Sequence, residues 1–317
     1  APGHSRAHTH REAASRTGSS VRLCRVVTAS AWPNPSVPKT MTTMSRSKNT
    51  PVELEGVPET LLMTLYNRAV ESQRSAPILR DDLATAWVDR IDYDFSVFGN
   101  GRITHPIRAK VLDGWAQAFL ARHPDARVVN LGAGLSTMHA RIDNGQAQFV
   151  DLDLTEAIAV RRRFVKETER HRLIASSALD PAWMDTLDTN RPTFFVAAGL
   201  LMYFEPRDVQ RLLCALADRF PGSEMVFDVI STWMAQRSQQ GTAQAGDYTF
   251  PPMPWALDYD RIPELETWHE GIEILQRRDY TRGFRKRWGW IGLLALIPPL
   301  RNRYMGTLVH TRFHTSS

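Results

Sequence analysis

The sequence contains few cysteines and no long apolar run, and both absences narrow the class of protein. Only Cys24 and Cys214 occur among 317 residues, which is too few for a disulfide scaffold or a structural zinc site. The longest apolar run, residues 290–300, includes one glycine and two prolines and is too short to cross a bilayer. We therefore expect a cytoplasmic protein without a metal and without stable membrane insertion, in which residues 290–300 are buried or face a partner; surface contact with lipid is the less favoured alternative.

Acidic side chains are nearly absent from the first 50 residues, which hold eight Lys and Arg and only Glu12 as an acid. This segment supplies the formal net charge of +5, so the rest of the chain is slightly acidic. No basic stripe with interleaved aromatic residues follows it, and we expect no nucleic-acid partner. Its Ser-, Thr- and Pro-rich composition predicts a disordered basic leader over residues 1–50, and is also typical of a transit peptide or an upstream-translated segment.

Apolar periodicity begins at residue 51 and predicts a folded domain over residues 51–317. Leu61, Leu65 and Ala69 recur at helical spacing, and a longer helix follows Pro106, with apolar residues four apart up to Phe119. We interpret residues 51–125 as an N-terminal helical cap.

After residue 125 the period changes to short, mostly apolar runs, which alternate with the charged, helix-like segments 155–170 and 205–220. Strands buried on both faces and alternating with helices indicate an α/β fold with a doubly wound, Rossmann-like parallel sheet. We expect the strands of this core, residues 126–230, at 127–132, 147–154, 171–176, 193–199 and 224–230. Residues 231–262 are rich in Gln, Gly and Pro and predict a lid or substrate insertion, before closing strands within 263–317, at 271–280 and 306–313.

The stretch VVNLGAGLST, residues 128–137, runs from a strand into a glycine pair. In doubly wound folds the first turn after a strand cradles a ligand, and Gly132, Ala133 and Gly134 fit that turn. Asp153 lies nineteen residues after Gly134, where a carboxylate that binds a ribose diol is expected. The turn and its acid therefore predict an adenosine-containing ligand, with Asp151 as a flanking ligand or a solvated strand end; Asp153 could instead cap a helix near Thr155.

The third glycine of a dinucleotide turn is absent, and Thr137 stands in its place. That glycine lets the helix approach a pyrophosphate closely. NAD and S-adenosylmethionine both fit the paired turn and acid, but the missing glycine favours S-adenosylmethionine.

Five successive blocks resemble the leucine carboxyl methyltransferase superfamily, in particular its bacterial polyketide O-methyltransferases of the tetracenomycin type. The blocks are VVNLGAGLSTMHARID, FVDLDLTEAI, RLIASSALDPAWMD, FFVAAGLLMYFEP and FPGSEMVFDVIS. The resemblance implies a class I methyltransferase that binds S-adenosylmethionine and methylates a carboxylate or phenol oxygen of a small molecule. It also implies that Gly132 and Gly134 form the cofactor turn, that Asp153 binds the ribose, and that Ser177 and Ala178 contact the adenine.

Three positions depart from the family pattern. Ser136 and Met138 replace an acid and an arginine, and Ala198 replaces a carboxylate expected near the cofactor. We expect Ala198 to lie at the cofactor site, and its lost carboxylate leaves open a catalytically weakened, cofactor-binding homologue.

The acceptor side is predicted from residues around these blocks. Arg108 flanks the apolar face of its helix and resembles the family's arginine that meets a carboxylate; a solvated flank is the alternative. Tyr203, at the end of the fourth strand, shapes an acceptor pocket or belongs to the core. His105 or His139 could serve as base for a phenol; the alternatives are that His105 only precedes a helix and that His139 is a solvated helix residue. We expect methyl-ester formation on a small polyketide-like or aromatic acid, with phenol methylation, cofactor binding without turnover and NAD-dependent oxidoreduction as alternatives.

Overall fold

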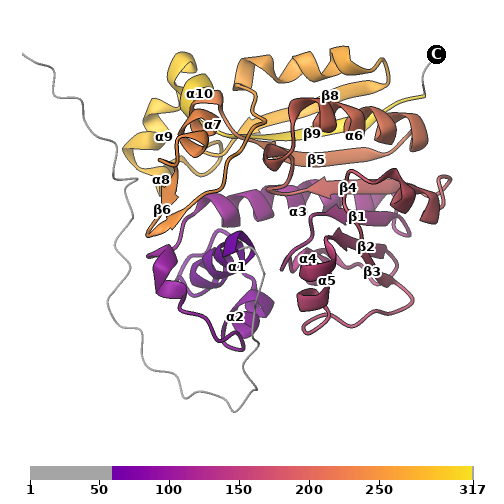
Figure 1. Ribbon diagram of the computed structural model, residues 1–317, viewed down its shortest axis with the longest axis horizontal. Helices are drawn as coiled ribbons and strands as arrows, with labels where there is room; N and C mark the ends of the chain where they lie inside the picture. Colours follow the sequence, from indigo (N-terminus) through magenta and orange to yellow (C-terminus); the bar gives the residue numbers. More distant parts are fainter. Residues whose placement is uncertain (1–58, 316–317) are drawn as a thin grey trace, which may run out of the picture. The chain divides into compact units, whose positions relative to one another are not determined.

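A seven-stranded sheet organises the part of the chain that the computed structural model describes, residues 59–315 (Figure 1). Its order is β3-β2-β1-β4-β5-β9-β8; the first five strands run parallel, and β9 runs antiparallel to β5 and β8. The doubly wound parallel core is thus confirmed. The strands are β1 Arg127–Leu131, β2 Gln148–Asp153, β3 His171–Ala175, β4 Thr193–Ala197, β5 Glu224–Val229, β8 Ile272–Asp279 and β9 Thr307–Phe313.

Alternate residues of the central strands enter two different cores, which explains why these strands are mostly apolar. Val129 of β1 and Phe195 of β4 lie in the core that also contains the leucines of α6 (Pro206–Arg219). Val128 and Phe194 lie in the opposite core, with Phe119 of α3 (Thr104–Arg122). Because side chains alternate between the faces of a strand, both faces of the sheet are covered.

A helical region, here called the cap, occupies the described start of the chain, and its assignment as a separate cap over residues 51–125 stays a prediction. It comprises α1 (Glu59–Ser72), α2 (Asp82–Val88) and the 3₁₀ turn Phe95–Phe98, and α1 packs against both α2 and α3. The remaining elements are α4 Met138–Ile142, α5 Thr155–Arg161, α7 Thr232–Gln239, β6 Gln244–Ala245, β7 Tyr248–Thr249, α8 Arg285–Trp288, α9 Trp290–Leu294, α10 Pro298–Tyr304 and the 3₁₀ segments Pro181–Thr186, Leu201–Tyr203 and Tyr259–Trp268. The predicted leader, residues 1–50, lies outside the described residues.

Two expectations for the segments between strands need correction. The helix expected over 155–170 ends at Arg161. The guanidinium of Arg161 is buried and pairs with Asp151, whereas an exposed helix was expected there. Residues 231–262 are not irregular throughout, because Ser231 caps α7 and a small hairpin, β6–β7, follows. Trp255 of this segment is buried in the core, so at this residue the insertion packs against its own domain.

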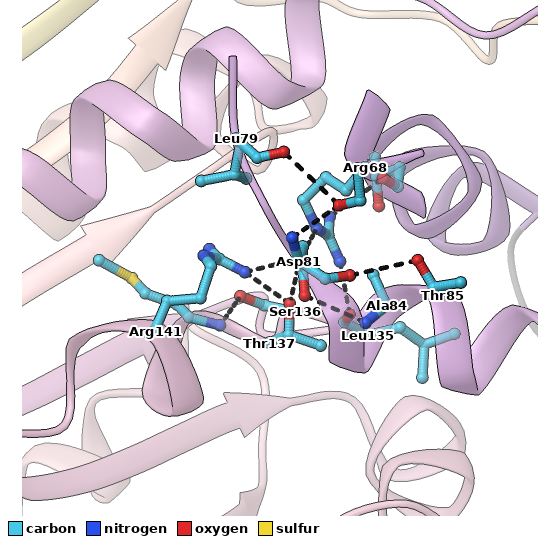
Figure 2. Close-up of polar contacts among 12 residues, drawn as sticks. Arg68, Leu79, Asp81, Ala84, Thr85, Leu135, Ser136, Thr137 and Arg141 are labelled. Carbon is cyan, nitrogen blue, oxygen red and sulfur yellow. Dashed lines mark hydrogen bonds and ion pairs between the residues drawn. The ribbon is translucent and has the colours of Figure 1, made fainter. Parts of the chain in front are cut away.

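A buried cluster of ions joins the cap to the loop that follows β1 (Figure 2). Oδ2 of Asp81 accepts hydrogen bonds from Arg68 Nε at 2.9 Å, Arg141 Nη1 at 2.8 Å and Thr137 Oγ1 at 2.6 Å. Arg68 also donates through Nη2 to the carbonyl oxygen of Leu135 at 2.8 Å. One carboxylate therefore connects α1, the start of α2, the loop and α4.

Electrostatics keep Asp81 ionised in this cluster. Burial by itself would raise the pKa of the Asp81 carboxyl, but the guanidinium groups of Arg68 and Arg141 outweigh it and the pKa is lowered. A carboxyl whose pKa is lower in the folded than in the unfolded state stabilises the fold above its unfolded pKa, and this contribution is lost as the pH falls through the folded pKa.

We predict that Asp81→Asn lowers the free energy of unfolding by about 3–5 kcal/mol, because it leaves buried guanidinium groups short of a counter-charge. Urea unfolding measured at pH 7 tests this. The difference from the unsubstituted protein should shrink below about pH 4, where the Asp81 carboxyl becomes protonated in the unfolded chain. The control is Asp82→Asn, an exposed neighbour, which should change stability by less than about 0.5 kcal/mol; equal effects of both variants would contradict the prediction.

Candidate active site

A glycine turn follows β1 at the carboxyl end of the sheet. Gly132 and Gly134 have φ angles of +64° and +45°, a region that side chains with a Cβ rarely adopt. A Cβ on Gly132 would lie 2.8 Å from Leu200 Cδ1, and one on Gly134 would lie 2.5 Å from Leu61 Cδ2. Both glycines are therefore required by conformation and by close neighbours.

Asp153, the last residue of β2, lies directly beside this turn. Its Oδ2 accepts a hydrogen bond from the Gly134 amide at 2.7 Å, and its Oδ1 accepts one from the Leu154 amide at 2.8 Å. Burial raises the pKa of the Asp153 carboxyl although both amides act in the opposite direction. The N-cap of α5 is Leu154, with no side-chain cap, so the helix-capping alternative for Asp153 is wrong.

The turn is also held through its carbonyl groups. Arg161 donates through Nη1 to the carbonyl oxygens of Gly134 and Ser136, both at 2.8 Å. Its Nη2 lies 2.5 Å from Asp151 Oδ2, and Asn130 Nδ2 donates to Asp151 Oδ1 at 3.2 Å. Asp151 is only 3% exposed, so the expectation of a solvated strand end is wrong. Its carboxylate supports the turn through Arg161.

A second charged cluster lies at the ends of β4 and β5. Arg108 Nη1 of α3 is 2.9 Å from Asp228 Oδ2, which also accepts a hydrogen bond from Tyr280 Oη at 2.9 Å. The Gly199 amide donates to Asp228 Oδ1 at 2.5 Å, and a Cβ at Gly199 would lie 2.6 Å from Arg108 Nη1. Burial would lower the pKa of Arg108, but Asp228 outweighs it and the pKa is raised. Arg108 is therefore not a solvated flank.

His105, one turn before Arg108, has a fixed tautomer. Asn67 Oδ1 accepts from the Arg102 amide at 2.9 Å, which turns Asn67 Nδ2 toward His105 Nδ1 at 2.6 Å. Because an amide nitrogen only donates, Nδ1 is the acceptor, and the neutral ring carries its proton on Nε2. Burial, together with Arg108, holds the pKa of His105 well below its usual value.

Comparison with known proteins identifies the kind of site. The model of the leucine carboxyl methyltransferase family matches residues 61–217. The tetracenomycin polyketide synthesis O-methyltransferase TcmP of Streptomyces glaucescens is 37% identical over 186 residues, which make up 57% of this chain and 69% of TcmP. This chain belongs to the leucine carboxyl methyltransferase family. It is an S-adenosylmethionine-dependent O-methyltransferase.

Two further likenesses accompany this assignment. The S-adenosyl-L-methionine-dependent methyltransferase dpfgK of Gibberella zeae is 28% identical over 276 residues, covering 76% of this chain and 88% of dpfgK. A solved O-methyltransferase family protein from Burkholderia thailandensis superposes with a TM-score of 0.43 at 14% identity, covering 81% of this chain and 72% of that one. The strand order of the sheet, β3-β2-β1-β4-β5-β9-β8, comes from the structure itself and is that of an α/β fold, as the sequence predicted.

The residues at the glycine turn fit the nucleoside of S-adenosylmethionine. A carboxylate has about four acceptor positions, and the backbone amides of Gly134 and Leu154 occupy two of those on Asp153. Two remain for a vicinal diol, and further acceptance of hydrogen bonds would offset the burial of this charge. The assignment of Gly132, Gly134 and Asp153 to the cofactor stays a prediction that this geometry supports.

The other predicted cofactor residues lie along the same edge of the sheet, with different surroundings. Ala133 is buried, and its amide donates to the Leu152 carbonyl at 3.0 Å. Ser177 follows β3, where its Oγ accepts from the Leu179 amide at 3.2 Å, and Ala178 packs in the core beneath. Ala198 packs against the α3 side of the sheet. Their contacts with the cofactor stay predictions.

Tyr203 interacts with the cluster of Arg108 and Asp228, whereas His139 belongs to a different part of the fold. Tyr203 ends a 3₁₀ turn after β4 and interacts electrostatically with Arg108 and Asp228; burial raises the pKa of its hydroxyl. His139 lies elsewhere, on α4, with its ring centroid 4.5 Å from that of His171. Burial lowers the pKa of His139 to about 4, so its ring is neutral at pH 7.

His139, Asp151 and His171 present ligand atoms within 4.8 Å of one another. Such a group is a possible metal site by residue type. Oδ2 of Asp151 already accepts from Arg161 at 2.5 Å and 2.9 Å and lies 2.5 Å from His171 Nε2. A cation would have to displace the guanidinium that supports the glycine turn, so the group acts as part of that support.

The sequence did not indicate the partners of the predicted residues. No motif or spacing indicates Asp81, Arg68 or Tyr280, and Asp228 lies within FPGSEMVFDVIS without a motif of its own. Asp228 is an acid near the end of a mostly apolar strand, as Asp153 is, but it has no glycine turn at the spacing that indicates Asp153. The position of an acid near the carboxyl end of β5 is the one local signal for Asp228.

We predict that Asp153→Asn weakens binding of S-adenosylhomocysteine by about 1–3 kcal/mol, because a neutral amide loses charge-assisted hydrogen bonds to the ribose. Isothermal titration calorimetry measures this, with NAD as a ligand that should give no heat. Glu156→Gln, which changes an exposed acid in the first turn of α5, is the matched control. Unchanged affinity in Asp153→Asn would show that the ribose binds elsewhere.

Proposed function

We propose that this methyltransferase methylates a carboxylate oxygen of a small polyketide-like or aromatic acid and releases a methyl ester. The Arg108 guanidinium, held by Asp228 at the same edge of the sheet as the glycine turn, carries the proposal. A guanidinium has five N–H donors in a planar fork that matches a carboxylate. Asp228 and Tyr280 leave donors of Arg108 for the acceptor. The polyketide O-methyltransferase among its relatives supports the acceptor class.

The chain's own residues have a positioning role in this reaction. S-adenosylmethionine, when bound, supplies an electrophilic methyl group, and the acceptor oxygen bonds to it while the electrons of the broken C–S bond stay on sulfur. Arg108 orients the acceptor carboxylate, while Asp153 and the glycine turn hold the nucleoside. Since the acceptor is ionised at neutral pH, no proton has to move, and alignment lowers most of the barrier.

Phenol methylation is the less favoured alternative because neither His105 nor Tyr203 is suited to act as its base. The Nδ1 lone pair of His105 already accepts a hydrogen bond from Asn67. Burial raises the pKa of the Tyr203 hydroxyl, so this hydroxyl stays protonated at neutral pH and does not act as a base. A phenol, with a pKa near 10, needs a group that removes its proton.

The alternative of a weakened homologue rested on the carboxylate missing at Ala198. Asp228, on the neighbouring strand, brings a carboxylate to the amide of the next residue, Gly199. The presence of Asp228 supports an active enzyme, because a carboxylate is present beside Ala198 although the residue itself has none.

Arg108→Gln should lower kcat/KM for carboxylic acid acceptors about 10–100-fold, because charge-assisted hydrogen bonds contribute roughly 1.5–3 kcal/mol. Benzoic and naphthoic acids and the matching phenols serve as acceptors, with methyl esters and ethers resolved by mass spectrometry. Binding of S-adenosylhomocysteine should change less than about twofold.

Two further variants make this test decisive. Arg108→Gln leaves Asp228 buried without its partner, so the double variant R108Q/D228N provides a chain without an unpaired charge. Lys110→Gln changes an exposed cation of the same helix and should keep full activity. If R108Q and K110Q esterify acids equally well, Arg108 does not hold the acceptor.

The pH dependence separates the two acceptor classes. A carboxylic acid with a pKa near 4 is fully ionised above about pH 6. We therefore expect kcat/KM for acids to be constant between pH 6 and 9, measured with a methyl-transfer assay in constant ionic strength. A rise of about tenfold per pH unit would instead indicate that the reacting oxygen is a phenol that ionises in solution.

A further inference from the structure

The C-terminal helices carry an unusual concentration of exposed apolar side chains. Eight large apolar side chains are exposed among the described residues, and six of them lie within residues 290–304. Trp290 is 59% exposed, Leu293 64%, Leu296 54% and Ile297 48%; Leu294 and Tyr304 complete the group. We call these six residues the C-terminal apolar face. Contiguous exposed patches of this kind mark interaction sites.

This face belongs to a segment that is apolar on both sides. Trp288, Ile291 and Ala295 are buried in a core cluster that includes Ile107 of α3 and Leu308 of β9. The segment is therefore anchored to the domain, and α8, α9 and α10 appear together as the yellow helices of Figure 1. A helix that is apolar all round is normally covered on all sides, so the C-terminal apolar face requires an occupant.

The charged side chains of the segment that carries the face are all basic. Residues 280–306 contain six Lys and Arg and no Asp or Glu. Arg285 and Lys286 are exposed, and neither has a carboxylate partner within residues 59–315. Arg303 is also exposed, with its guanidinium 5.7 Å from the ring centre of Tyr304. The occupant should therefore be anionic.

We propose that the C-terminal apolar face docks on an anionic lipid surface, with its apolar side chains inserted among the acyl chains and the basic residues at the headgroups. Basic helices with Trp and Leu on one side bind membrane interfaces in this way. No helix in the described part of the chain has the length and apolar character to span a bilayer, so the contact is peripheral. A second copy of the chain would bring like charges together, and so would the basic first 50 residues.

Hydrogen bonds and an ion pair link the segment that carries the face to the candidate active site and to the cap. Trp288 Nε1 donates to the Tyr280 carbonyl at 3.2 Å, and Tyr280 Oη donates to Asp228. Arg287 pairs with Glu71 of the cap at 2.7 Å. The segment that carries the face is therefore connected to the candidate active site by hydrogen bonds, and docking does not depend on which acceptor is methylated.

Vesicle flotation of the full chain tests the proposal, with phosphatidylcholine vesicles alone or containing 30% phosphatidylglycerol. We expect binding to the anionic vesicles, weakened at 0.5 M salt relative to 0.1 M. W290S/L293S should lower the fraction bound at least about tenfold, as should R285E/K286E. All four residues are exposed, so folding is not at risk.

Matched controls change the same residue types elsewhere on the surface. L179S removes an exposed leucine outside the face, and R211E/R261E reverses two exposed arginines; both should bind as the unsubstituted protein does. Absence of vesicle binding would overturn the proposal and leave an acidic protein as the occupant. Binding that persists in W290S/L293S would also overturn it, as would self-association abolished by that variant.

Discussion

The loop of residues 132–137 is held between two buried ion pairs, and the geometry of the candidate site depends on this double support. On one side Arg68, paired with Asp81, donates to the Leu135 carbonyl. On the other side Arg161, paired with Asp151, donates to the carbonyls of Gly134 and Ser136. A loop that leaves a strand has no regular partners for its backbone, and buried backbone groups without partners destabilise a fold. The arginines supply these partners, and the carboxylates offset the burial of the arginines.

This arrangement suits a reaction that depends on position. Buried ion pairs contribute little net stability compared with apolar packing, but their hydrogen bonds fix one geometry of the groups that they contact. Here they fix a turn whose neighbouring carboxylate, Asp153, keeps acceptor positions for a ligand. The same principle recurs at the ends of β4 and β5, where Asp228 fixes Arg108. The two side chains proposed to bind the ligands, Asp153 and Arg108, are thus each positioned through separate ion pairs before either ligand binds.

The strands could be predicted from sequence because each contains an apolar run that fills both cores, as Val128 and Val129 do. The glycine turn and Asp153 could be found because their spacing is local to one strand–turn–strand unit. The partners of Asp81 and Asp228 could not, since Arg141 and Arg108 are 60 and 120 residues away in the chain. The direction of β9, which enters between β5 and β8, had no local signal either, because strand periodicity is the same in both directions.

The departures from the family pattern become intelligible through these long-range contacts. Ser136 and Met138 stand where the family usually has an acid and an arginine, yet the loop keeps a charged environment. Thr137, which lies between Ser136 and Met138, donates a hydrogen bond to Asp81. Arg141 donates to both Asp81 and Thr137. The acid and the arginine that are missing from the motif have counterparts near the loop in space, namely Asp81 at the start of α2 and Arg141 of α4. A motif comparison registers the loss because it reads only neighbouring positions, whereas the electrostatics of a buried loop depend on every charge within a few ångströms. The same reasoning applies to Ala198, beside which Asp228 provides the carboxylate.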